Sequence, residues 1–170
     1  MDGFHLTRAQ LSALPDPDEA HRRRGAAFTF DGTAFLALVQ ALRAPLTADS
    51  AVIFAPAFSH AARDPVPGAL ALEPARRLLV FEGNYVCRAE GPWAEAAALM
   101  DERWFVDVPP AVARARLVRR HVAAGLAADE AAAERRADDN DLPNGRDIVR
   151  LLLPVDEVVE GRDDVAWGPQ

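Results

Sequence analysis

The chain has 170 residues, half of them hydrophobic, which is enough for one domain with a sizeable core and excludes disorder throughout. Its net charge of −7 argues against a nucleic-acid-binding surface, and no apolar run approaches the roughly 20 residues that cross a bilayer. Cys87 is the only cysteine and the N-terminus has no signal-peptide pattern, so a reducing cytoplasm is the expected location.

The chain contains no lysine, and all 19 basic residues are arginine. Schiff-base catalysis on a lysine is therefore excluded, and so is a phosphate-binding loop that depends on a lysine. One cysteine and four scattered histidines do not give the ligand spacing of a zinc site. The sequence has no G-x-S-x-G elbow and no G-x-G-x-x-G pattern, so neither a hydrolase nucleophile nor a Rossmann site is predicted.

The N-terminal part of the chain predicts two helices with a polar connection. Residues 7–10 have the form of a capping box, so a short helix is expected there, and Pro15 ends it. Asp31 is expected to cap a second helix with a clear apolar face. The connection at 16–24 closes with three consecutive arginines, and it is either a solvated face or a small anion-binding patch.

Short apolar runs at 51–55, 78–82 and 104–108 predict three strands, and 157–160 predicts a weak fourth. Pro56 is expected to close the first of them. The 78–82 run ends in Glu82 and a glycine, which is typical of a strand buried on both faces of a parallel sheet. Ligands bind beyond the carboxyl ends of such strands, so Glu82 is a candidate functional residue. The alternative is a strand that ends at a turn, with Glu82 solvated.

Helical patterns separate these runs. We expect helices at 93–100, 110–125 and 129–136, loops or turns at 58–65 and 138–145, and a helix or apolar connector at 148–153. Gly125 is the expected C-terminal cap and Asp129 the expected N-cap. Strands alternating with helices predict an α/β fold with a parallel sheet flanked by helices. No internal boundary is visible, so a single domain over 1–170 is expected, with a loose tail at 161–170.

The helix that follows Pro110 is rich in arginine. Arg116, Arg119 and Arg120 share one face, and Arg114 lies on the same helix. Cations this close repel each other unless an anion relieves them. Either a polyanionic ligand, such as a nucleotide phosphate, or acidic side chains of a neighbouring segment could do so.

Two carboxylates are the second group of candidates. Asp2 and Glu82 each lie beside a glycine at the edge of an apolar segment. One could take the proton from an attacking hydroxyl, and the other could hold a magnesium ion, directly or through water. The alternative for either acid is that it only marks a turn.

Six motifs occur in an order that resembles one family. They are M-D-G-F-H at 1–5, R-G-A-A-F-T-F-D at 24–31, F-E-G-N-Y at 81–85, F-V-D-V-P at 105–109, R-L-V-R-R-H at 116–121 and N-D-L-P-N at 140–144. The set extends from Met1 to about Val159. It resembles the phosphoribulokinase, uridine kinase and bacterial pantothenate kinase branch of P-loop kinases, especially its nucleoside/nucleotide kinase-like members.

The resemblance implies a three-layer P-loop NTPase-like sandwich and transfer of phosphate from ATP, with Mg²⁺, to a hydroxyl of a nucleoside-, pantothenate- or sugar-like small molecule. It implies that Asp2 is the base and that Glu82 lies near magnesium. The further implied residues are His5, Arg24, His60 and Tyr85 in the acceptor pocket, Arg116, Arg119 and Arg120 as a phosphate-contacting lid, and Asn140, Asp141 and Asn144 near the lid or the acceptor. The arginines at 22–24 slightly favour an acceptor with an anionic group. No nucleic-acid or membrane partner is expected, and a homodimer is left open.

The sequence departs from the family pattern at its start. The family opens with a strand, a glycine-rich loop ending in Gly-Lys-Ser/Thr, a helix and a second strand, all before the motif with which this sequence begins. That loop holds the β- and γ-phosphates and magnesium, so we expect an N-terminally truncated kinase-like domain that is inactive or incomplete alone. Met1 could be an internal methionine of a longer protein, the chain could be a degenerate remnant, or a partner could supply the missing part. The alternative functions are a non-catalytic small-molecule or nucleotide-binding module and a fragment that does not fold alone.

Overall fold

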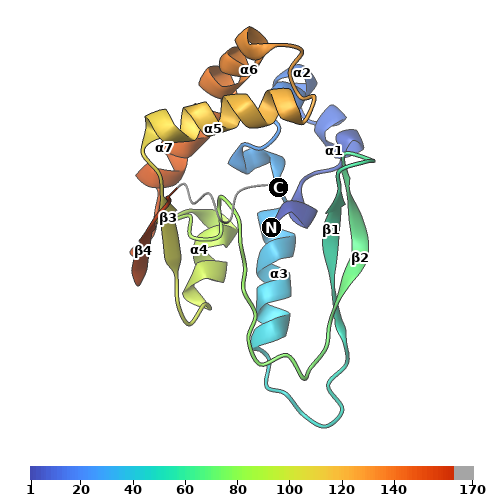
Figure 1. The fold of residues 1–170 in the computed structure, drawn as a ribbon. Helices are drawn as coiled ribbons and strands as arrows, with labels where there is room; N and C mark the ends of the chain where they lie inside the picture. Colours follow the sequence, from blue (N-terminus) through green and yellow to red (C-terminus); the bar gives the residue numbers. More distant parts are fainter. Residues whose placement is uncertain (163–170) are drawn as a thin grey trace. The chain divides into compact units, whose positions relative to one another are not determined.

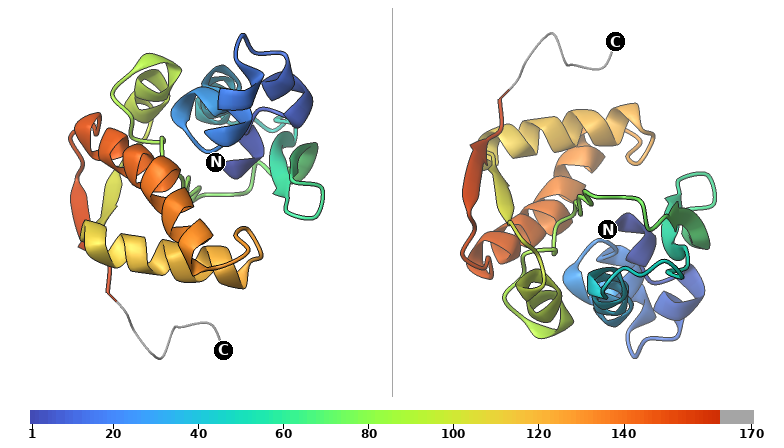
Figure 2. Two further views of the ribbon diagram at one scale, coloured as in Figure 1. Left: turned by 90° about the horizontal axis from the view of Figure 1, so that it is seen from above. Right: turned by 90° about the horizontal axis from the view of Figure 1, so that it is seen from below.

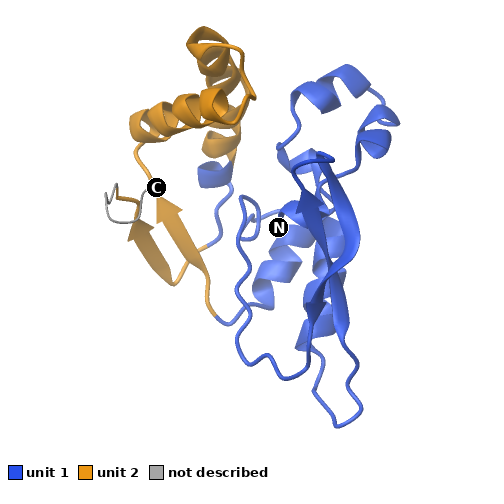
Figure 3. Cartoon of the chain, turned by 45° about the vertical axis from the view of Figure 1, so that its right-hand side comes forward, with its two compact units in different colours: residues 1–101, 148–153 blue, residues 102–147, 154–170 orange. Residues whose placement is uncertain are grey.

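A computed structural model describes residues 1–162, which form two compact units (Figure 3). Unit 1 consists of residues 1–101 and 148–153, and unit 2 of residues 102–147 and the stretch from 154. Most of the predicted tail at 161–170 lies outside the described residues, which end at Arg162. The single domain expected for 1–170 stays a prediction.

The helices of unit 1 are η1 (Asp2–Phe4), α1 (Arg8–Ser12), α2 (Pro17–Arg22), η2 (Ala27–Thr29), α3 (Gly32–Arg43) and α4 (Gly91–Ala98). Polar side chains cap the starts of α1, α2 and α3. The predicted capping box is confirmed, because the side chains of Thr7 and Gln10 each accept a hydrogen bond from the other residue's backbone N–H. The cap of α3 is also confirmed, since Ala34 N donates to the Asp31 carboxylate at 2.8 Å.

Unit 1 contains a β-hairpin where the sequence predicted a short strand and a loop. β1 (Ile53–Ser59) pairs antiparallel with β2 (Asp64–Leu72) (Figure 1). The prediction that Pro56 closes this strand is therefore wrong, and the loop predicted at 58–65 is confirmed only for the turn at 60–63. The register shifts between Ala55 and Ala57, and a proline is tolerated at such an irregularity because the ladder needs no N–H there.

The run at 78–82 is extended, but it pairs with no strand in residues 1–162, so the prediction of a strand buried on both faces is wrong. Leu78 and Val80 are 81% and 83% exposed. Residues 77–81 make no backbone hydrogen bond within the part of the chain that the structure describes. An apolar run becomes an inner strand only where strands lie beside it, and the described residues place none there.

The core of unit 1 is aromatic. It consists of Phe4, Phe30, Phe35, Val39, Tyr85, Trp93 and Ala96. Phe4 meets Phe35 edge-on at 5.3 Å between ring centroids, and Phe30 meets Tyr85 edge-on at 5.4 Å. These contacts fix η1 against α3, and the stretch after Glu82 against the residue that follows η2.

Unit 2 combines a parallel strand pair with helices. Its elements are β3 (Trp104–Asp107), α5 (Pro110–Ala123), α6 (Glu130–Arg136), the π-helical turn η3 (Ala137–Asp141), α7 (Leu142–Arg150) and β4 (Glu157–Glu160). β3 and β4 pair in parallel and lie side by side in both views of Figure 2. The strands predicted at 104–108 and 157–160 are therefore confirmed. The Asp129 cap is confirmed as well, because Ala132 N donates to Asp129 Oδ1 at 2.7 Å, and so is the left-handed Gly125 after α5.

The loop and turn predicted at 138–145 are wrong, because these residues are helical in η3 and α7. Pro143 is the second residue of α7, which continues from the π-helical turn η3 without a break. The last three residues of α7 belong to unit 1, where Ile148 packs against the aromatic core. Among residues 1–162, no helix is both long and apolar enough to span a membrane.

Candidate functional site

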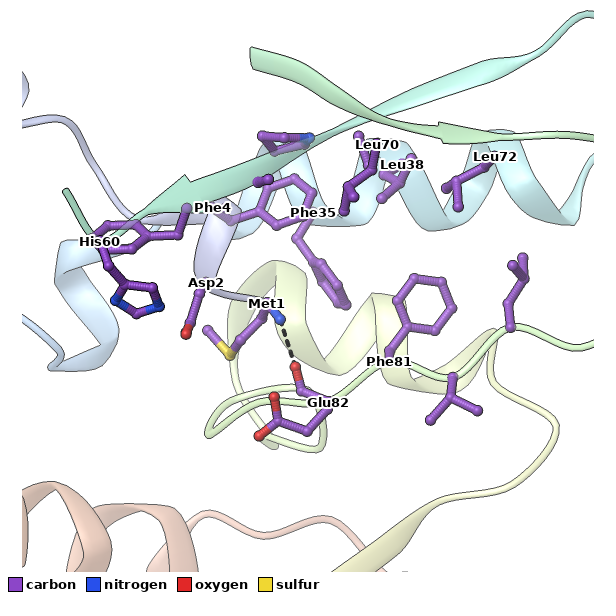
Figure 4. A pocket seen from close by; sticks show the side chains of 17 residues that line it. Met1, Asp2, Phe4, Phe35, Leu38, His60, Leu70, Leu72, Phe81 and Glu82 are labelled. Carbon is purple, nitrogen blue, oxygen red and sulfur yellow. Dashed lines mark hydrogen bonds between the residues drawn. The ribbon is translucent and has the colours of Figure 1, made fainter. Parts of the chain in front are cut away.

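Unit 1 contains a cavity of about 350 Å³ (Figure 4). Its walls come from η1, α3, the β-hairpin and the extended run that ends at Glu82. The lining residues are Met1, Asp2, Gly3, Phe4, Phe35, Leu38, Ala55, Pro56, Ala57, Phe58, His60, Leu70, Leu72, Leu79, Val80, Phe81 and Glu82. Both predicted catalytic carboxylates, which are 80 positions apart in sequence, line this one cavity.

Asp2 is held at the cavity by the packing of η1. A side chain at Gly3 would bring its Cβ within 2.1 Å of the Pro56 carbonyl oxygen, so a glycine allows η1 to lie directly on β1. On the other side of η1, Asp31 N donates to Phe4 O at 2.7 Å. The Asp2 carboxylate is exposed and makes no hydrogen bond or ion pair with any residue in 1–162.

Glu82 reaches the same cavity from the end of the extended run. The terminal amine of Met1 donates to the Glu82 backbone carbonyl oxygen at 2.5 Å, and Figure 4 shows this bond. Gly83 packs on the Met1 side chain so closely that a Cβ there would lie 1.8 Å from Met1 Cγ. Like that of Asp2, the Glu82 carboxylate is exposed and has no partner within residues 1–162.

Of the four residues predicted to bind the acceptor, His60 lines the cavity and the other three do not. The His5 ring stacks on Phe30 with 4.0 Å between centroids, and its Nδ1 lies 2.8 Å from Asp2 O. Burial lowers the pKa of His5, although the hydrogen bond and charge of Asp2 act in the opposite direction. Tyr85 is buried in the core, where its hydroxyl donates to Gly25 O at 2.7 Å.

Arg24 ties three segments of unit 1 together. Its guanidinium donates to Leu6 O, Arg63 O and Asp64 Oδ1 at 3.0, 2.7 and 2.9 Å, and it lies over the Phe58 ring. Burial acts to raise the pKa of Asp64, but the hydrogen bonds from Arg8 N and Arg24 outweigh it, so this pKa is lowered. Asp64 was not among the predicted site residues, and nothing in its local sequence marks it.

The apolar wall of the cavity was also missed from the sequence. Leu70 and Leu72 of β2 and Leu38 of α3 supply much of it. The alternating A-L-A-L pattern at 69–72 is the signal that could have found the β2 side, because side chains two apart share one face of a strand.

The end of the cavity that carries Asp2 and Glu82 suits magnesium, which needs few protein ligands, better than a metal ion that protein side chains bind alone. Within residues 1–162, no three His, Cys, Asp or Glu side chains gather as a metal site. Magnesium commonly takes one or two carboxylates and completes its shell with phosphate oxygens and water. Asp2 and Glu82, which have no other partners there, fit that donor set.

The arginine helix α5 of unit 2, labelled in Figure 1, is partly neutralised by acidic side chains of neighbouring segments. Arg114 binds Asp138 through two hydrogen bonds of 2.7 and 2.8 Å, and Glu134 through one of 3.2 Å. The hydrogen bond with Asp138 raises the pKa of Arg114 and lowers that of Asp138. For Arg114, acidic side chains of neighbouring segments are therefore the counter-charges.

The other arginines of α5 differ from Arg114. Arg119 and Arg120 are exposed and form no ion pair within residues 1–162, although Arg119 Nε donates to Ala115 O at 3.3 Å. Arg116 is half-buried. The two exposed guanidinium groups are the cations of this helix that remain open to an anion.

The residues predicted near the lid are packed inside unit 2. His121 is 3% exposed, and its Nε2 lies 3.3 Å from Asp141 Oδ2. Burial raises the pKa of Asp141, although nearby positive charges lower it. Asn140 and Asn144 are buried one helical turn apart, with Asn144 Nδ2 3.5 Å from Asn140 Oδ1. Asp2 and Glu82 belong to unit 1 and these residues to unit 2.

No protein-family profile matches the chain. The chain is 55% identical over 161 residues to the ATP-dependent kinase-like protein notR' of Aspergillus versicolor, which covers 95% of this chain and 94% of that protein. It is 37% identical over 160 residues to a candidate uridine kinase of Schizosaccharomyces pombe, covering 94% of this chain and 67% of the relative.

A solved structure shows the same fold. YFH7 of Saccharomyces cerevisiae, described as a candidate P-loop-containing kinase with a circular permutation, superposes with a TM-score of 0.82 and 32% identity. The match covers 96% of this chain and 57% of YFH7, so the chain spans just over half of that relative. The predicted α/β fold of the P-loop NTPase type is therefore confirmed.

Proposed function

Because the chain belongs to the family of ATP-dependent, uridine kinase-like P-loop kinases, we propose that the cavity of unit 1 is the acceptor site of a phosphoryl transfer from ATP to a hydroxyl of a small molecule. One observation carries the proposal. Asp2 and Glu82 come from distant parts of the sequence, line the same cavity and have no partner within residues 1–162. Carboxylates that a fold leaves uncompensated beside a cavity are typical of functional sites.

The two acids have different proposed roles. The Asp2 carboxylate accepts the proton from the attacking hydroxyl, which leaves the oxygen free to bond to phosphorus. Glu82 would hold magnesium, directly or through water, and that ion would supply positive charge beside the transferring phosphate. His60, at the same end of the cavity, is in position to hydrogen-bond the acceptor.

In unit 2, α5 is the proposed lid. Arg119 and Arg120 are the exposed cations that would contact phosphate oxygens, together with Arg116. The buried Asn140 and Asn144 and the half-buried Asp141 would then hold the shape of the lid. Arg24, His5 and Tyr85, which make internal contacts in unit 1, would position the acceptor cavity.

A second candidate function is a binding module that holds a small molecule or nucleotide without turnover. The observation in its favour is that the 170 residues contain no lysine, so they cannot include the loop lysine that grips the β- and γ-phosphates. A chain that keeps the acceptor cavity could still bind its small molecule.

Two measurements on the 170-residue chain separate these functions. Calorimetric titration with ATP tests binding in the presence and absence of Mg²⁺, and radiolabelled ATP tests transfer to a panel of nucleosides, pantothenate, sugars and simple alcohols. Magnesium-dependent ATP binding with label appearing on an acceptor supports the kinase. Acceptor binding without ATP binding or transfer contradicts it and supports the binding module.

A further inference from the structure

The extended run at 76–82 in unit 1 pairs with no strand in the described part of the chain (Figure 1). Leu78 and Val80 are 81% and 83% exposed, whereas Leu79 and Phe81 are half-buried. Exposure that alternates with a period of two is typical of a strand with one face on the core and one face outward. The run therefore has the pattern of a strand, but its backbone has no partner strand among residues 1–162.

The run also lacks the features that usually protect an exposed strand edge. Natural edge strands carry a lysine, a proline or a bulge that prevents further pairing. This chain has no lysine, and residues 78–81 are all apolar, with no proline among them. Residues 77–81 make no backbone hydrogen bond within the part of the chain that the structure describes. A further strand is therefore expected to cover this edge.

One edge of the run is the better place for that strand. In a strand, the backbone groups of alternate residues point to the same edge. The terminal amine of Met1 donates to the Glu82 carbonyl oxygen, so the edge to which residue 82 and the even-numbered residues before it point lies toward Met1. The backbone groups of residues 77, 79 and 81 point to the opposite edge, where they can form the bonded pairs of an antiparallel ladder.

The sequence of the run is complementary to itself in the antiparallel direction. A two-fold axis at Leu79 places Leu78 opposite Val80 of a second copy, and Arg76 opposite Glu82 of that copy. A shift of two residues in either direction would set a charged side chain opposite an apolar one. A shift of one residue would turn the outward face of one run toward the core side of the other. Parallel pairing in register would bring like charges together.

We propose that a second copy of this chain supplies the missing strand, and that the two runs pair antiparallel about Leu79. Leu78 and Val80 of both copies then form one apolar cluster that leaves water. Arg76 and Glu82 are exposed, and neither side chain forms an ion pair within residues 1–162. In the dimer, Arg76 of each copy lies opposite Glu82 of the other. The contact is short, so the dimer should be weak and exchange with the monomer.

Pairing and magnesium binding exclude each other at Glu82, because a guanidinium and a metal ion would compete for one carboxylate. The dimer is therefore tested without magnesium. Dimer formation needs no phosphoryl transfer. A chain that dimerises but transfers no phosphate keeps this interface and loses the proposed function, and a chain that transfers phosphate but never dimerises does the reverse.

Sedimentation equilibrium on the full chain tests the dimer. Between about 1 and 200 µM, the average mass should rise from the 18.4 kDa of one chain toward twice that value. Leu78→Asp should hold the chain at the monomer mass, because it places carboxylates in the apolar cluster. Leu46→Asp, the same change at an exposed leucine outside the run, is the control and should leave the dimer intact. Both variants should keep the wild-type circular dichroism spectrum, because both leucines are mostly exposed.

Three results would overturn the second copy as the occupant of this edge. They are a monomer over the whole concentration range, a species larger than a dimer, and a dimer that survives Leu78→Asp. A monomer that binds an extended peptide of another protein at this run would assign the edge to a different partner.

A charge exchange tests the register. Arg76→Glu leaves acids at both ends of the run and Glu82→Arg leaves arginines at both, so each variant alone should dimerise at least about tenfold more weakly than the wild type. Mixed in equal amounts, the two variants should recover a dimer, because every acid then faces an arginine. Arg77→Glu, which makes the same change in net charge one residue away, should keep the dissociation constant within about twofold. A mixture that stays monomeric, or an equal loss in Arg77→Glu, would contradict this pairing.

Discussion

The carboxylates of unit 1 and the arginines of unit 2 are treated differently by the fold. Asp2 and Glu82 line a cavity and have no partner within residues 1–162, whereas Arg114 is bound by two carboxylates and His121 lies against a third. In the sequence, both groups were charges that needed an explanation. The contrast separates charges that hold structure from charges that the fold leaves available to a ligand.

The same contrast exists inside each unit. In unit 1, Arg24 and Asp64 satisfy each other, while Asp2 is left uncompensated. In unit 2, Arg114 is paired, while Arg119 and Arg120 have no ion pair in the described part of the chain. Substituting a charge from the structural set should therefore change stability, and substituting one from the open set should change ligand binding or transfer.

The largest effect is expected at Asp2. Asp2→Asn removes the proposed base and should lower phosphoryl transfer by about 10²–10⁴-fold. Its melting temperature should stay that of the wild type, because the Asp2 carboxylate has no partner to lose within residues 1–162. Asp49→Asn, the same change at an exposed position away from the cavity, is the control and should leave transfer unchanged. A transfer rate that survives in Asp2→Asn would place Asp2 among the structural charges.

The next largest effect is expected at His121, for stability. His121→Ala empties a buried site and leaves the half-buried Asp141 without its neighbour, which should cost about 2–3 kcal/mol of unfolding free energy. Urea unfolding measures it. Arg119→Ala on the same helix is the control and should change the free energy by no more than about 0.5 kcal/mol. Equal losses of unfolding free energy in the two variants would mean that His121 and Arg119 contribute alike to stability.

Local signals in the sequence predicted much of this fold. The caps at Thr7, Asp31 and Asp129 and the left-handed Gly125 are confirmed, because each depends on residues within one turn. Proline was misleading at Pro56, where an irregular register tolerates it inside a strand. The run at 78–82 was assigned from its composition alone, but a strand also needs neighbouring strands.

The candidate site was also predictable only in part, because local motifs do not show tertiary contacts. The family resemblance marked Asp2, His60 and Glu82, which line one cavity. It gave no sign that Arg24 is occupied by Asp64, because that pair joins residues 40 positions apart. The apolar wall of the cavity depends on how the β-hairpin packs on α3, and no single motif contains that tertiary contact.

A smaller effect is expected from the titration of His5. Its pKa in the folded chain lies below the ordinary value of about 6.5, because burial disfavours the charged ring. Above pH 6.5 the ring is neutral in both states and its contribution is constant. As the pH falls below 6.5, the unfolded chain binds the proton first, so the folded state loses stability. Urea unfolding between pH 8 and pH 5 should show this loss, and His5→Gln should reduce the slope. An unchanged slope would mean that His5 is not buried in the folded chain.

The smallest effect is expected for the exposed ion pairs of α5. Arg114→Gln should lower the melting temperature more than Arg119→Gln, because only Arg114 has carboxylate partners to lose. Both side chains lie in contact with solvent, so salt screens the pairs, and the difference between the variants should shrink as NaCl rises from about 0.05 to 1 M. Thermal melts at the two salt concentrations measure it. If Arg119→Gln lowers the melting temperature as much as Arg114→Gln at low salt, the open and paired arginines are not distinct. Arg119 would then stabilise the packing of α5 and would not be available to a phosphate.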